Sequence, residues 1–395
     1  MTTRNARVQK LLILSAAGLF AATVFAGLYG DTPDARHAWA VHDLNRPNPV
    51  KVTANPGEPP SDAVILFDGT EKTFANWCDT KGGPTKWKLV DGTLESVRGA
   101  GFIATRQSFG DCQLHLEWAS PKTVKGFGQG RGNSGVFLMG MYEIQVLDSF
   151  ETDPSKDPNP NPNYADGQAS AVYAENPPLV NASRGPGEWQ TYDIVFHQPV
   201  WEGDKMVWPG SVTVFHNGVL TQDHWEMEGL TTHCRRRPLR PHETKRPLQL
   251  QDHGNPVHFR NIWIREIPSR YANTTHGGPA ANTADVMKLR AETAARLFAK
   301  IDVSKPDAPA LRALLEVISY SKDAAYTDAL KKVCAGFRAK VEAMDDAALG
   351  KARKDLESVR GDLAVLRRNN VIGGDCELCR FLDALWARKG WGKAK

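Results

Sequence analysis

The sequence lacks a strong charge bias. Its 395 residues include 49 Lys and Arg against 45 Asp and Glu, which gives a net charge of +4. The excess is small and scattered along the chain, whereas nucleic-acid binding favours a concentrated basic surface. We therefore expect no nucleic-acid partner.

Cysteine is also scarce, with six residues in the chain. Cys376 and Cys379 form a CxxC, but Arg380 follows in place of the histidine that haem attachment requires. The chain has no second CxxC, and a single one is a weak indication of zinc. The alternatives left for this pair are a local disulfide or two buried thiols.

One long apolar run, LLILSAAGLFAATVFAGLYG, follows Arg4, Arg7 and Lys10. Residues 1–30 are expected to be a signal peptide that is cleaved near Ala26. The alternative is an uncleaved single-span anchor, which would tether the protein to a membrane. No cysteine follows the run, so a bacterial lipid anchor is not expected. In either case the protein is predicted to be exported, to the periplasm or the extracellular space.

The composition and periodicity of the rest of the chain change three times. Residues 31–60 are proline-rich and without periodicity, which predicts a linker or extended arm. Residues 61–268 carry at least nine short alternating runs with Asp-Gly and Asn-Gly turns, typical of an antiparallel two-sheet sandwich. A Gly- and Ala-rich linker at 269–283 leads to residues 284–395, where four runs have helical periodicity. The predicted fold is therefore mainly β, with a C-terminal α-helical bundle. The bundle carries no motif with chemistry, and its expected role is structural or the binding of a protein partner.

Three of the predicted strands have one apolar face and one face that holds Glu, Gln and His but no Lys. Side chains alternate between the two faces of a strand, so these polar groups share a side. A solvated outer face is one explanation. The other, which we favour, is a groove that binds the hydroxyls of a glycan. The polar residues are His115, Glu117, Glu143, Gln145, Gln249, Gln251 and His253.

The run YEIQVLD resembles the E-x-D-x-x-E strand of retaining laminarinases and lichenases. A β-bulge after Gln145 would bring Asp148 to the face of Glu143. Retaining glycosidases need two carboxylates about 5 Å apart. Here Gln replaces the middle acid and Asp the last, so the pair is compromised.

Several ordered segments together resemble the 3-keto-disaccharide hydrolase domain family. They are GRGNSGVFLMGMYEIQVLDS, YADGQASAVY, PPLVNASRGPGEWQTYDIVF, VTVFHNGVL and LQLQDHGNPVHFRNIWIREI. The likeness covers about residues 61–268 and leaves out the helical tail. It implies a concanavalin-like jelly roll and the cleavage of glycosidic bonds in sugars that are oxidised at C3.

In such a sugar the C3 ketone acidifies the C2 proton, so a base near C2 can trigger loss of the glycosidic oxygen. From strand alternation we predict Glu143 and His253 as proton-transfer groups. Glu117 and His115 would complete a second acid/base pair. Alternatively, they would hold a divalent metal ion together with His253, and we expect no other cofactor. Asp148 is either a further groove acid or the cap of a strand end. The substrate-binding candidates are Arg131, Asn133, Gln145, Gln251, Arg260 and Trp189. Arg260 could instead be a solvent-exposed side chain, and Trp189 could instead belong to the core.

Two other functions stay open at this point. A conventional retaining endoglucanase would use Glu143 as its nucleophile on unoxidised glucans. A lectin-like module with this fold would bind a carbohydrate without turnover, because the fold does not decide the function.

Overall fold

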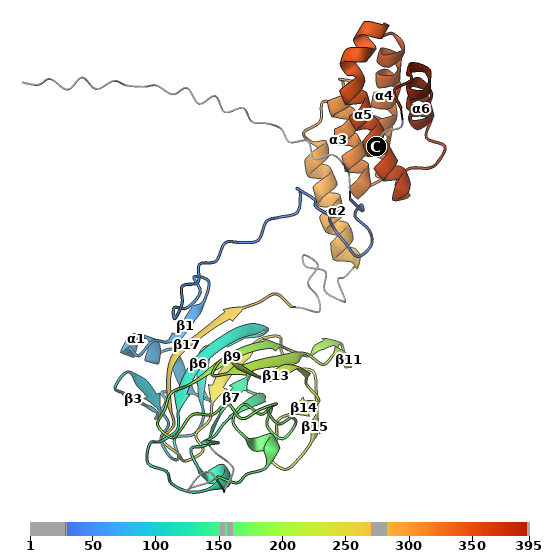
Figure 1. Cartoon of the computed structure of the whole chain (residues 1–395). Helices are drawn as coiled ribbons and strands as arrows, with labels where there is room; N and C mark the ends of the chain where they lie inside the picture. The colour runs from blue at the N-terminus through green and yellow to red at the C-terminus, as the bar shows by residue number, and fades with distance from the viewer. Residues whose placement is uncertain (1–27, 29, 151–154, 156–160, 270–282, 393–395) are drawn as a thin grey trace, which may run out of the picture. The chain divides into compact units, whose positions relative to one another are not determined.

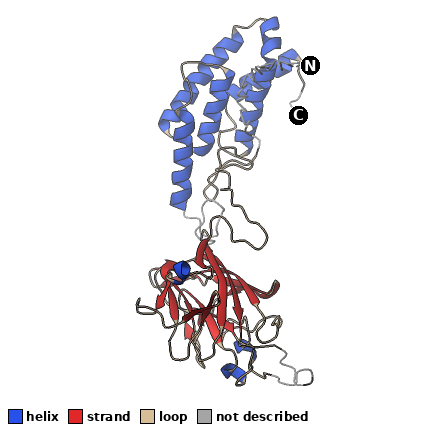
Figure 2. Ribbon diagram, turned by 90° about the vertical axis from the view of Figure 1, so that its left-hand side faces the viewer, coloured by secondary structure: helices blue, strands red, loops and turns tan. Residues whose placement is uncertain are grey.

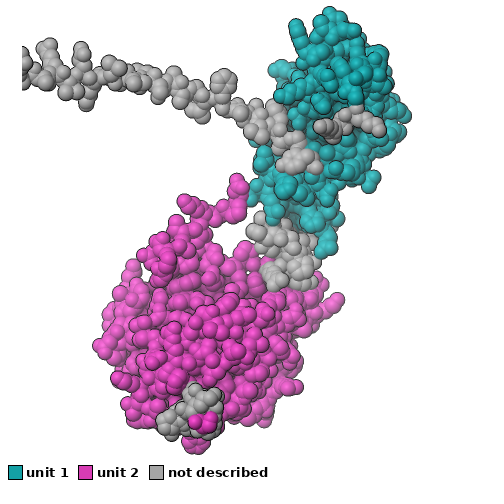
Figure 3. Space-filling model, viewed as in Figure 1, with its two compact units in different colours: residues 1–47, 283–395 teal, residues 48–282 magenta. Residues whose placement is uncertain are grey.

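The computed structural model describes residues 28, 30–150, 155, 161–269 and 283–392. The chain divides into two compact units, coloured separately in Figure 3. Asn48–Asn282 form a β-sandwich, and Met1–Pro47 together with Thr283–Lys395 form a helical unit. The sandwich is therefore inserted in sequence between two parts of the helical unit.

Among its described residues the sandwich unit contains one short α-helix, α1 (Glu71–Phe74), two 3₁₀ helices at Gly128–Gly130 and Ala165–Gly167, and a series of strands. The strands are β1 (Val64–Phe67), β2 (Trp77–Asp79), β3 (Lys88–Val90), β4 (Thr93–Glu95), β5 (Ile103–Phe109), β6 (Cys112–Ala119), β7 (Ser134–Leu138), β8 (Tyr142–Val146), β9 (Gln190–His197), β10 (Val200–Glu202), β11 (Lys205–Trp208), β12 (Ser211–His216), β13 (Val219–Glu226), β14 (Gly229–Leu230), β15 (Arg237–Pro238), β16 (Arg246–Leu250) and β17 (His258–Glu266).

Most of these strands form two antiparallel sheets (Figures 1 and 2). The eight-stranded sheet has the order β13-β12-β9-β6-β17-β4-β3, and β1 pairs with β17. The five-stranded sheet has the order β2-β5-β16-β7-β8. The expected two-sheet jelly-roll sandwich is confirmed.

Two predicted hairpins close as their sequences require. Asp91-Gly92 joins β3 to β4, and Asn217-Gly218 joins β12 to β13. The φ angles are 47° and 71° in the first turn and 52° and 78° in the second. A two-residue turn with positive φ at both central residues has a twist that matches the twist of paired strands. Asn, Asp and Gly tolerate positive φ best, which is why they occupy these turns.

The eight-stranded sheet shows the predicted alternation in β6. Leu114 and Leu116 are fully buried and Trp118 nearly so, and all three belong to the core between the sheets. Burial of each such side chain stabilises the fold by about 1.5–3 kcal/mol. His115 and Glu117 are half-buried on the opposite, outer face of this sheet.

The five-stranded sheet shows the same alternation in β8. Tyr142, Ile144 and Val146 belong to the same core. Glu143 and Gln145 alternate with them and therefore lie on the outer face of the five-stranded sheet. Because both sheets turn their apolar faces to one core, the two polar faces lie on opposite sides of the sandwich.

Five helices form the second unit, counting its described residues. They are α2 (Thr283–Phe298), α3 (Ala308–Tyr320), α4 (Ala324–Glu342), α5 (Asp346–Arg368) and α6 (Glu377–Lys389). Asp307, Asp323 and Asp345 cap the N-termini of α3, α4 and α5 by accepting backbone N–H bonds. The four runs with helical periodicity form α2 to α5, and α6 is additional.

The first part of the proline-rich arm belongs to the helical unit. Asn45 Nδ2 donates to Glu316 Oε1 at 2.7 Å, and the Tyr320 hydroxyl donates to Asp43. Arg290 Nη1 donates to the carbonyl oxygen of Asp34 at 3.0 Å. Residues up to 47 are therefore tied to helices, which differs from the single arm expected over 31–60.

None of the six cysteines forms a disulfide. Cys376 caps α6, and its Sγ accepts the N–H of Cys379 at 3.3 Å. Of the two alternatives for this CxxC, the structure shows free thiols, with Cys379 buried. The predicted signal or anchor segment lies outside the described residues except for 28 and 30, and none of the helices described is long and apolar enough to cross a membrane.

Candidate active site

Glu143 lies in the middle of β8, where the strand is fully regular. β8 pairs with β7 without a bulge, and Glu143 stands opposite Phe137. Its N–H donates to Thr231 Oγ1 at 2.8 Å, and the residue is only 4% exposed. Loop residues therefore cover this part of the outer face, which makes it a sheltered site.

Burial raises the pKa of the Glu143 carboxyl to about 8. No hydrogen-bond donor or cation pairs with this carboxyl in the part of the chain that is described. The ionised form consequently loses hydration without compensation, which is the physical cause of the shift. A carboxyl with such a pKa exchanges protons near neutrality, as catalytic acids and bases do.

A glycine on the neighbouring strand makes room for this carboxyl. Gly135 of β7 pairs with Gln145, and a Cβ built on it would overlap Glu143 Oε1. Any residue with a side chain at 135 would thus displace the carboxyl. The last glycine of the run GRGNSG therefore lies inside β7 and makes room for the Glu143 carboxyl.

Tyr173 stands beside Glu143 on the same face. An antiparallel bridge joins Ile144 to Val172, and the N–H of Tyr173 donates to the carbonyl oxygen of Glu143 at 3.1 Å. The segment thus extends the sheet by one short piece next to β8. Opposed residues on such a pair point to the same side.

The Tyr173 hydroxyl lies in a chain of three polar groups. It is 2.9 Å from the hydroxyl of Tyr164 and 2.9 Å from Nδ1 of His233. Burial raises the pKa of both tyrosines, and the charge of Glu143 adds to the shift in each. The carboxyl is therefore close to this chain, and the two phenols stay protonated near neutral pH.

A pocket of about 340 Å³ opens at the chain formed by Tyr164, Tyr173 and His233, and Glu143 is not one of the residues that line it. That volume falls within the range of about 300–1,000 Å³ typical of small-molecule sites. Tyr164 is 43% exposed at the pocket, whereas Tyr173 is buried. The lining residues are Tyr164, Asp166, Tyr173, Ala174, His233, Cys234, Arg235 and Arg236.

Two of the predicted hydroxyl-binding amides hold the loops of this face together. Gln145 Nε2 donates to Gln129 Oε1 at 2.7 Å, and Asn133 Nδ2 donates to the same oxygen at 2.8 Å. Gln129 Nε2 in turn donates to the carbonyl oxygen of Gly167. Gln145 therefore positions the loop beside Tyr164, while Asn133 Oδ1 is buried without a partner among the described residues.

The predicted convergence of Asp148 with Glu143 is wrong. β8 ends at Val146 without the required bulge. Asp148 instead pairs with Arg131 Nε at 2.7 Å, and both side chains are at most 3% exposed. Because this pair is buried beyond the end of the strand and borders a different pocket, neither residue stands beside Glu143.

Glu117 and His115 are not part of this site either. They lie on the outer face of the eight-stranded sheet, so the prediction that they share a hollow with Glu143 is wrong. Asn261 and Arg260 donate to Glu117, and His115 Nδ1 is 2.7 Å from Asp193 Oδ1. Burial opposes ionisation of Glu117, but these two hydrogen bonds outweigh it and lower the pKa of its carboxyl.

Trp189 lies in the same outer network. The guanidinium of Arg260 stacks on its ring, 3.9 Å from the centroid. This face of the indole is thus occupied by an arginine of its own chain, and both residues are remote from Glu143. They form a cation–π pair on the surface of the eight-stranded sheet.

His253 is exposed in the loop after β16, and its carbonyl oxygen accepts from Asn255. Gln251 lies nearer to the site, because its N–H donates to the carbonyl of Gly135, but its Oε1 is buried without a partner among the described residues. The described residues contain no group of three or more His, Cys, Asp or Glu side chains arranged to hold a metal ion. The predicted metal set of His115, Glu117 and His253 is therefore not assembled.

Three functional candidates escaped the sequence analysis: Tyr164, Tyr173 and His233. Both tyrosines lie in the segment YADGQASAVY, which carries no strand alternation, and His233 lies in a loop near a basic run. Only the pairing of residue 172 with β8 reveals that they meet Glu143.

Comparison with known proteins gives a consistent result for the sandwich. Residues 62–265 match the model of the 3-keto-alpha-glucoside-1,2-lyase-like domain family. A 3-keto-disaccharide hydrolase of Bacteroides thetaiotaomicron is 25% identical over 242 residues, which cover 52% of this chain and 78% of the relative.

A solved structure is also similar. It is the crystal structure of a Parabacteroides distasonis protein provisionally named a glycosyl hydrolase. The sequences are 40% identical, the match covers 56% of this chain and 93% of the other, and the TM-score is 0.51. The matched regions of all three comparisons are about half of this chain.

Proposed function

Because this chain belongs to the 3-keto-alpha-glucoside-1,2-lyase-like domain family, we propose that it is a carbohydrate-active enzyme that cleaves the glycosidic bond of 3-keto-glycosides. The observation that carries the proposal is Glu143, a buried carboxyl with a pKa of about 8, whose backbone pairs with that of Tyr173 so that both side chains leave the same face of the sheet. Tyr164, Tyr173 and His233 line the pocket, and Glu143 is buried beside Tyr173 on the same face of the sheet, which brings a proton acceptor close to proton donors.

The reaction begins with removal of the C2 proton, which the C3 ketone acidifies. The electron pair of the C–H bond forms the C2–C3 double bond of an enolate, and the C3 oxygen takes the charge. When the carbonyl re-forms, a C1–C2 double bond appears, the C1–O bond breaks, and the leaving oxygen takes up a proton. Addition of water across the C1–C2 double bond gives the hydrolysis product. Release of the unsaturated sugar before water adds gives the elimination product.

Glu143 is the proposed base at C2. In its ionised form it is more basic than an ordinary carboxylate, because its pKa is raised to about 8. General acid–base catalysis works best when the pKa of the group lies near the working pH. The rate should therefore rise with pH up to about 8 and level off above.

The tyrosine pair is proposed to supply protons. Tyr164 is exposed at the pocket, and its hydroxyl connects through Tyr173 to His233 Nδ1. Tyr164 can donate to the oxygen that gains charge, and the chain can restore its proton from the imidazole. Their raised pKa keeps the phenols protonated for this role.

A retaining glycosidase mechanism fits less well. That chemistry needs two carboxyl groups about 5–5.5 Å apart. Asp148, the predicted second acid, is bound to Arg131 outside the pocket. Burial alone raises the pKa of Glu143, with no contribution from a second carboxylate among the described residues.

The test compares turnover of a 3-keto-glucoside with that of laminarin by the full chain. Glu143→Gln should lower turnover of the keto sugar by about 10²-fold or more, and should also stop exchange of its C2 proton with deuterated water. His253→Ala is the matched control, because His253 lies outside the pocket, and it should keep wild-type turnover.

Two outcomes would contradict the proposal. Turnover of laminarin but not of the keto sugar would identify a conventional glucanase. Glycan affinity without turnover, unchanged in Glu143→Gln, would identify a lectin-like module instead.

We also propose that the enzyme is exported, on the strength of the apolar run after Arg4, Arg7 and Lys10. Cell fractionation of the full chain and mass spectrometry of its mature N-terminus test this. A cytoplasmic protein that retains residues 1–30 would contradict it.

A further inference from the structure

A second pocket of the sandwich, which we call the lysine pocket, is strongly cationic. It has a volume of about 700 Å³ and is lined by Lys88, Arg98, Lys122, Lys125 and Arg131 against two carboxylates. The carboxylates are Glu95, which pairs with His258 at 3.4 Å, and Asp148, which pairs with Arg131. The three lysines account for most of the charge that these pairs leave uncompensated.

The ammonium groups of the three lysines are unpaired within the described part of the chain. Among the described residues, no acceptor or carboxylate pairs with the ammonium groups of Lys88, Lys122 or Lys125. They come from two separate segments, β3 and the loop after β6. Like charges that converge on one hollow repel one another, and a bound anion would relieve that repulsion.

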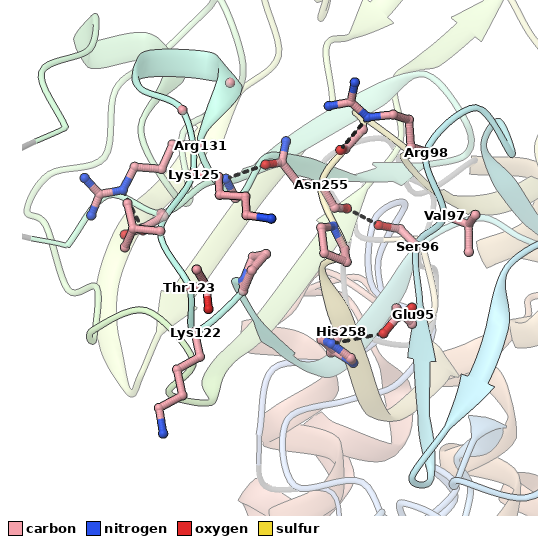
Figure 4. Close-up of a pocket in the computed structure, with 18 of the residues that line it drawn as sticks. Glu95, Ser96, Val97, Arg98, Lys122, Thr123, Lys125, Arg131, Asn255 and His258 are labelled. Atoms are coloured by element: carbon pink, nitrogen blue, oxygen red, sulfur yellow. Dashed lines mark hydrogen bonds and ion pairs between the residues drawn. The ribbon is translucent and has the colours of Figure 1, made fainter.

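The pocket is held in shape by a central asparagine (Figure 4). Asn255 Oδ1 accepts the N–H of Gly132 at 3.1 Å, and its carbonyl oxygen accepts from Ser96. In Figure 4 it lies between the segment of Lys122 and Lys125 on one side and that of Ser96 and Arg98 on the other. The walls are therefore fixed to each other before a ligand arrives, which lowers the entropic cost of binding.

One loop connects the lysine pocket to the candidate active site. Gly130, Arg131 and Gly132 line the lysine pocket, while Gln129 of the same loop bonds Gln145 beside Glu143. Phe127, 82% exposed, stands on this loop. An exposed aromatic ring offers a face on which a sugar ring can stack.

We infer that the lysine pocket binds a carboxylate or sulfate group carried by a saccharide, so that acidic glycosides are the preferred substrates of this chain. The saccharide part rests on the proposed function, whereas the anion part rests on the lysines alone. Lysine ammonium groups act as point charges toward an oxyanion and do not select between carboxylate and sulfate.

The test is calorimetric titration of the full chain carrying Glu143→Gln, so that no turnover interferes. The probes are three oligosaccharides of equal length: neutral, uronate-bearing and sulfated. We expect an acidic probe to bind roughly tenfold tighter than the neutral one, since exposed ion pairs contribute up to about 1 kcal/mol each. This preference should shrink when salt rises from about 50 to 300 mM.

Lys88, Lys122 and Lys125 changed together to Gln should abolish the preference. The matched control changes Lys72, Lys81 and Lys205 to Gln, which removes the same charge from exposed positions of the same unit outside the pocket. The control should keep the preference, and both variants should keep the thermal transition of the parent.

A preference that survives the lysine changes would overturn the inference, as would equal affinity for neutral and acidic probes. Inorganic sulfate that binds as tightly as the sulfated saccharide would overturn the saccharide part. Failure of the proposed function looks different, because lysine-dependent binding would persist while wild-type protein turned over no keto sugar.

Discussion

The N–H of Tyr173 donates to the carbonyl oxygen of Glu143 at 3.1 Å, and the two side chains leave this backbone pair on the same face. The carboxyl and the phenol are thus placed together by the sheet, without a bond between their side chains. Each can be altered while the other keeps its position, which makes the site suited to mutational analysis.

Gly135→Ala should reduce turnover of a 3-keto-glucoside strongly. The new methyl group would overlap Glu143 Oε1 and force the carboxyl away from its position. A displacement of about 1 Å in a reacting group costs roughly 10²-fold in rate. The control is Gly130→Ala, where no atom lies within 4 Å of the added Cβ. Full activity of Gly135→Ala would show that the carboxyl does not act from this position.

Tyr173→Phe should lower kcat by about 10- to 100-fold with little effect on the thermal transition, because it breaks the link between Tyr164 and His233. The matched control is Tyr142→Phe. Tyr142 also bonds a histidine, His242 Nε2 at 2.9 Å, but its ring lies in the core. Equal losses of kcat in both variants would contradict the relay.

The stability of the sandwich should depend on pH through Glu143. Its pKa is about 8 when folded and near 4.5 when exposed, so the folded state holds the extra proton between these values. As far as this group is concerned, the free energy of unfolding therefore stays at its full value below about pH 4.5. It falls as pH rises from there toward 8, by at most about 1.4 kcal/mol per pH unit.

Glu143→Gln should remove this slope, so that the variant gains stability over the wild type at alkaline pH. Urea unfolding at about pH 5 and 8.5 measures the difference. Glu188→Gln, the same change at an exposed position, serves as the control. A difference that stays constant with pH would argue against a buried, uncompensated carboxyl.

Asp148→Asn should destabilise the sandwich by about 3–5 kcal/mol, because it removes the buried carboxylate that pairs with the guanidinium of Arg131. Asp62→Asn breaks the pair with Arg265, whose side chains are 28% and 39% exposed, and should cost far less. Chemical denaturation of both variants gives the comparison. Equal small effects would mean that solvent reaches the Arg131 pair.

Strand alternation was sufficient to predict the sandwich and to place Glu143 on a polar face. It could not tell which polar faces meet, because alternation gives two sides for each strand but not the sheet to which the strand belongs. By alternation alone His115 and Glu117 are equivalent to Glu143, although they lie across the core from it. The family resemblance found in the sequence is confirmed by the family match over residues 62–265.

The site residues that strand alternation could not predict, Tyr164, Tyr173 and His233, have one feature in common: none belongs to a regular strand. Tyr164 and His233 lie outside the strands, and residues 171–173 join the sheet only through isolated bridges. Their positions follow from tertiary contacts rather than from a period of two. β5 lacks a period of two in its sequence, since four of its seven residues, Thr105, Arg106, Gln107 and Ser108, are polar in succession.

The hydrogen bonds between residues 28–47 and the helices determine the order in which the two units can fold during synthesis. Leu28 donates to Asp362, and Asn45 to Glu316, so each early residue emerges from the ribosome long before its partner. The sandwich has no such delay, because its terminal strands β1 and β17 pair with each other and are complete by residue 266. We therefore expect the inserted unit to fold cotranslationally while the surrounding helical unit waits for the last part of the chain.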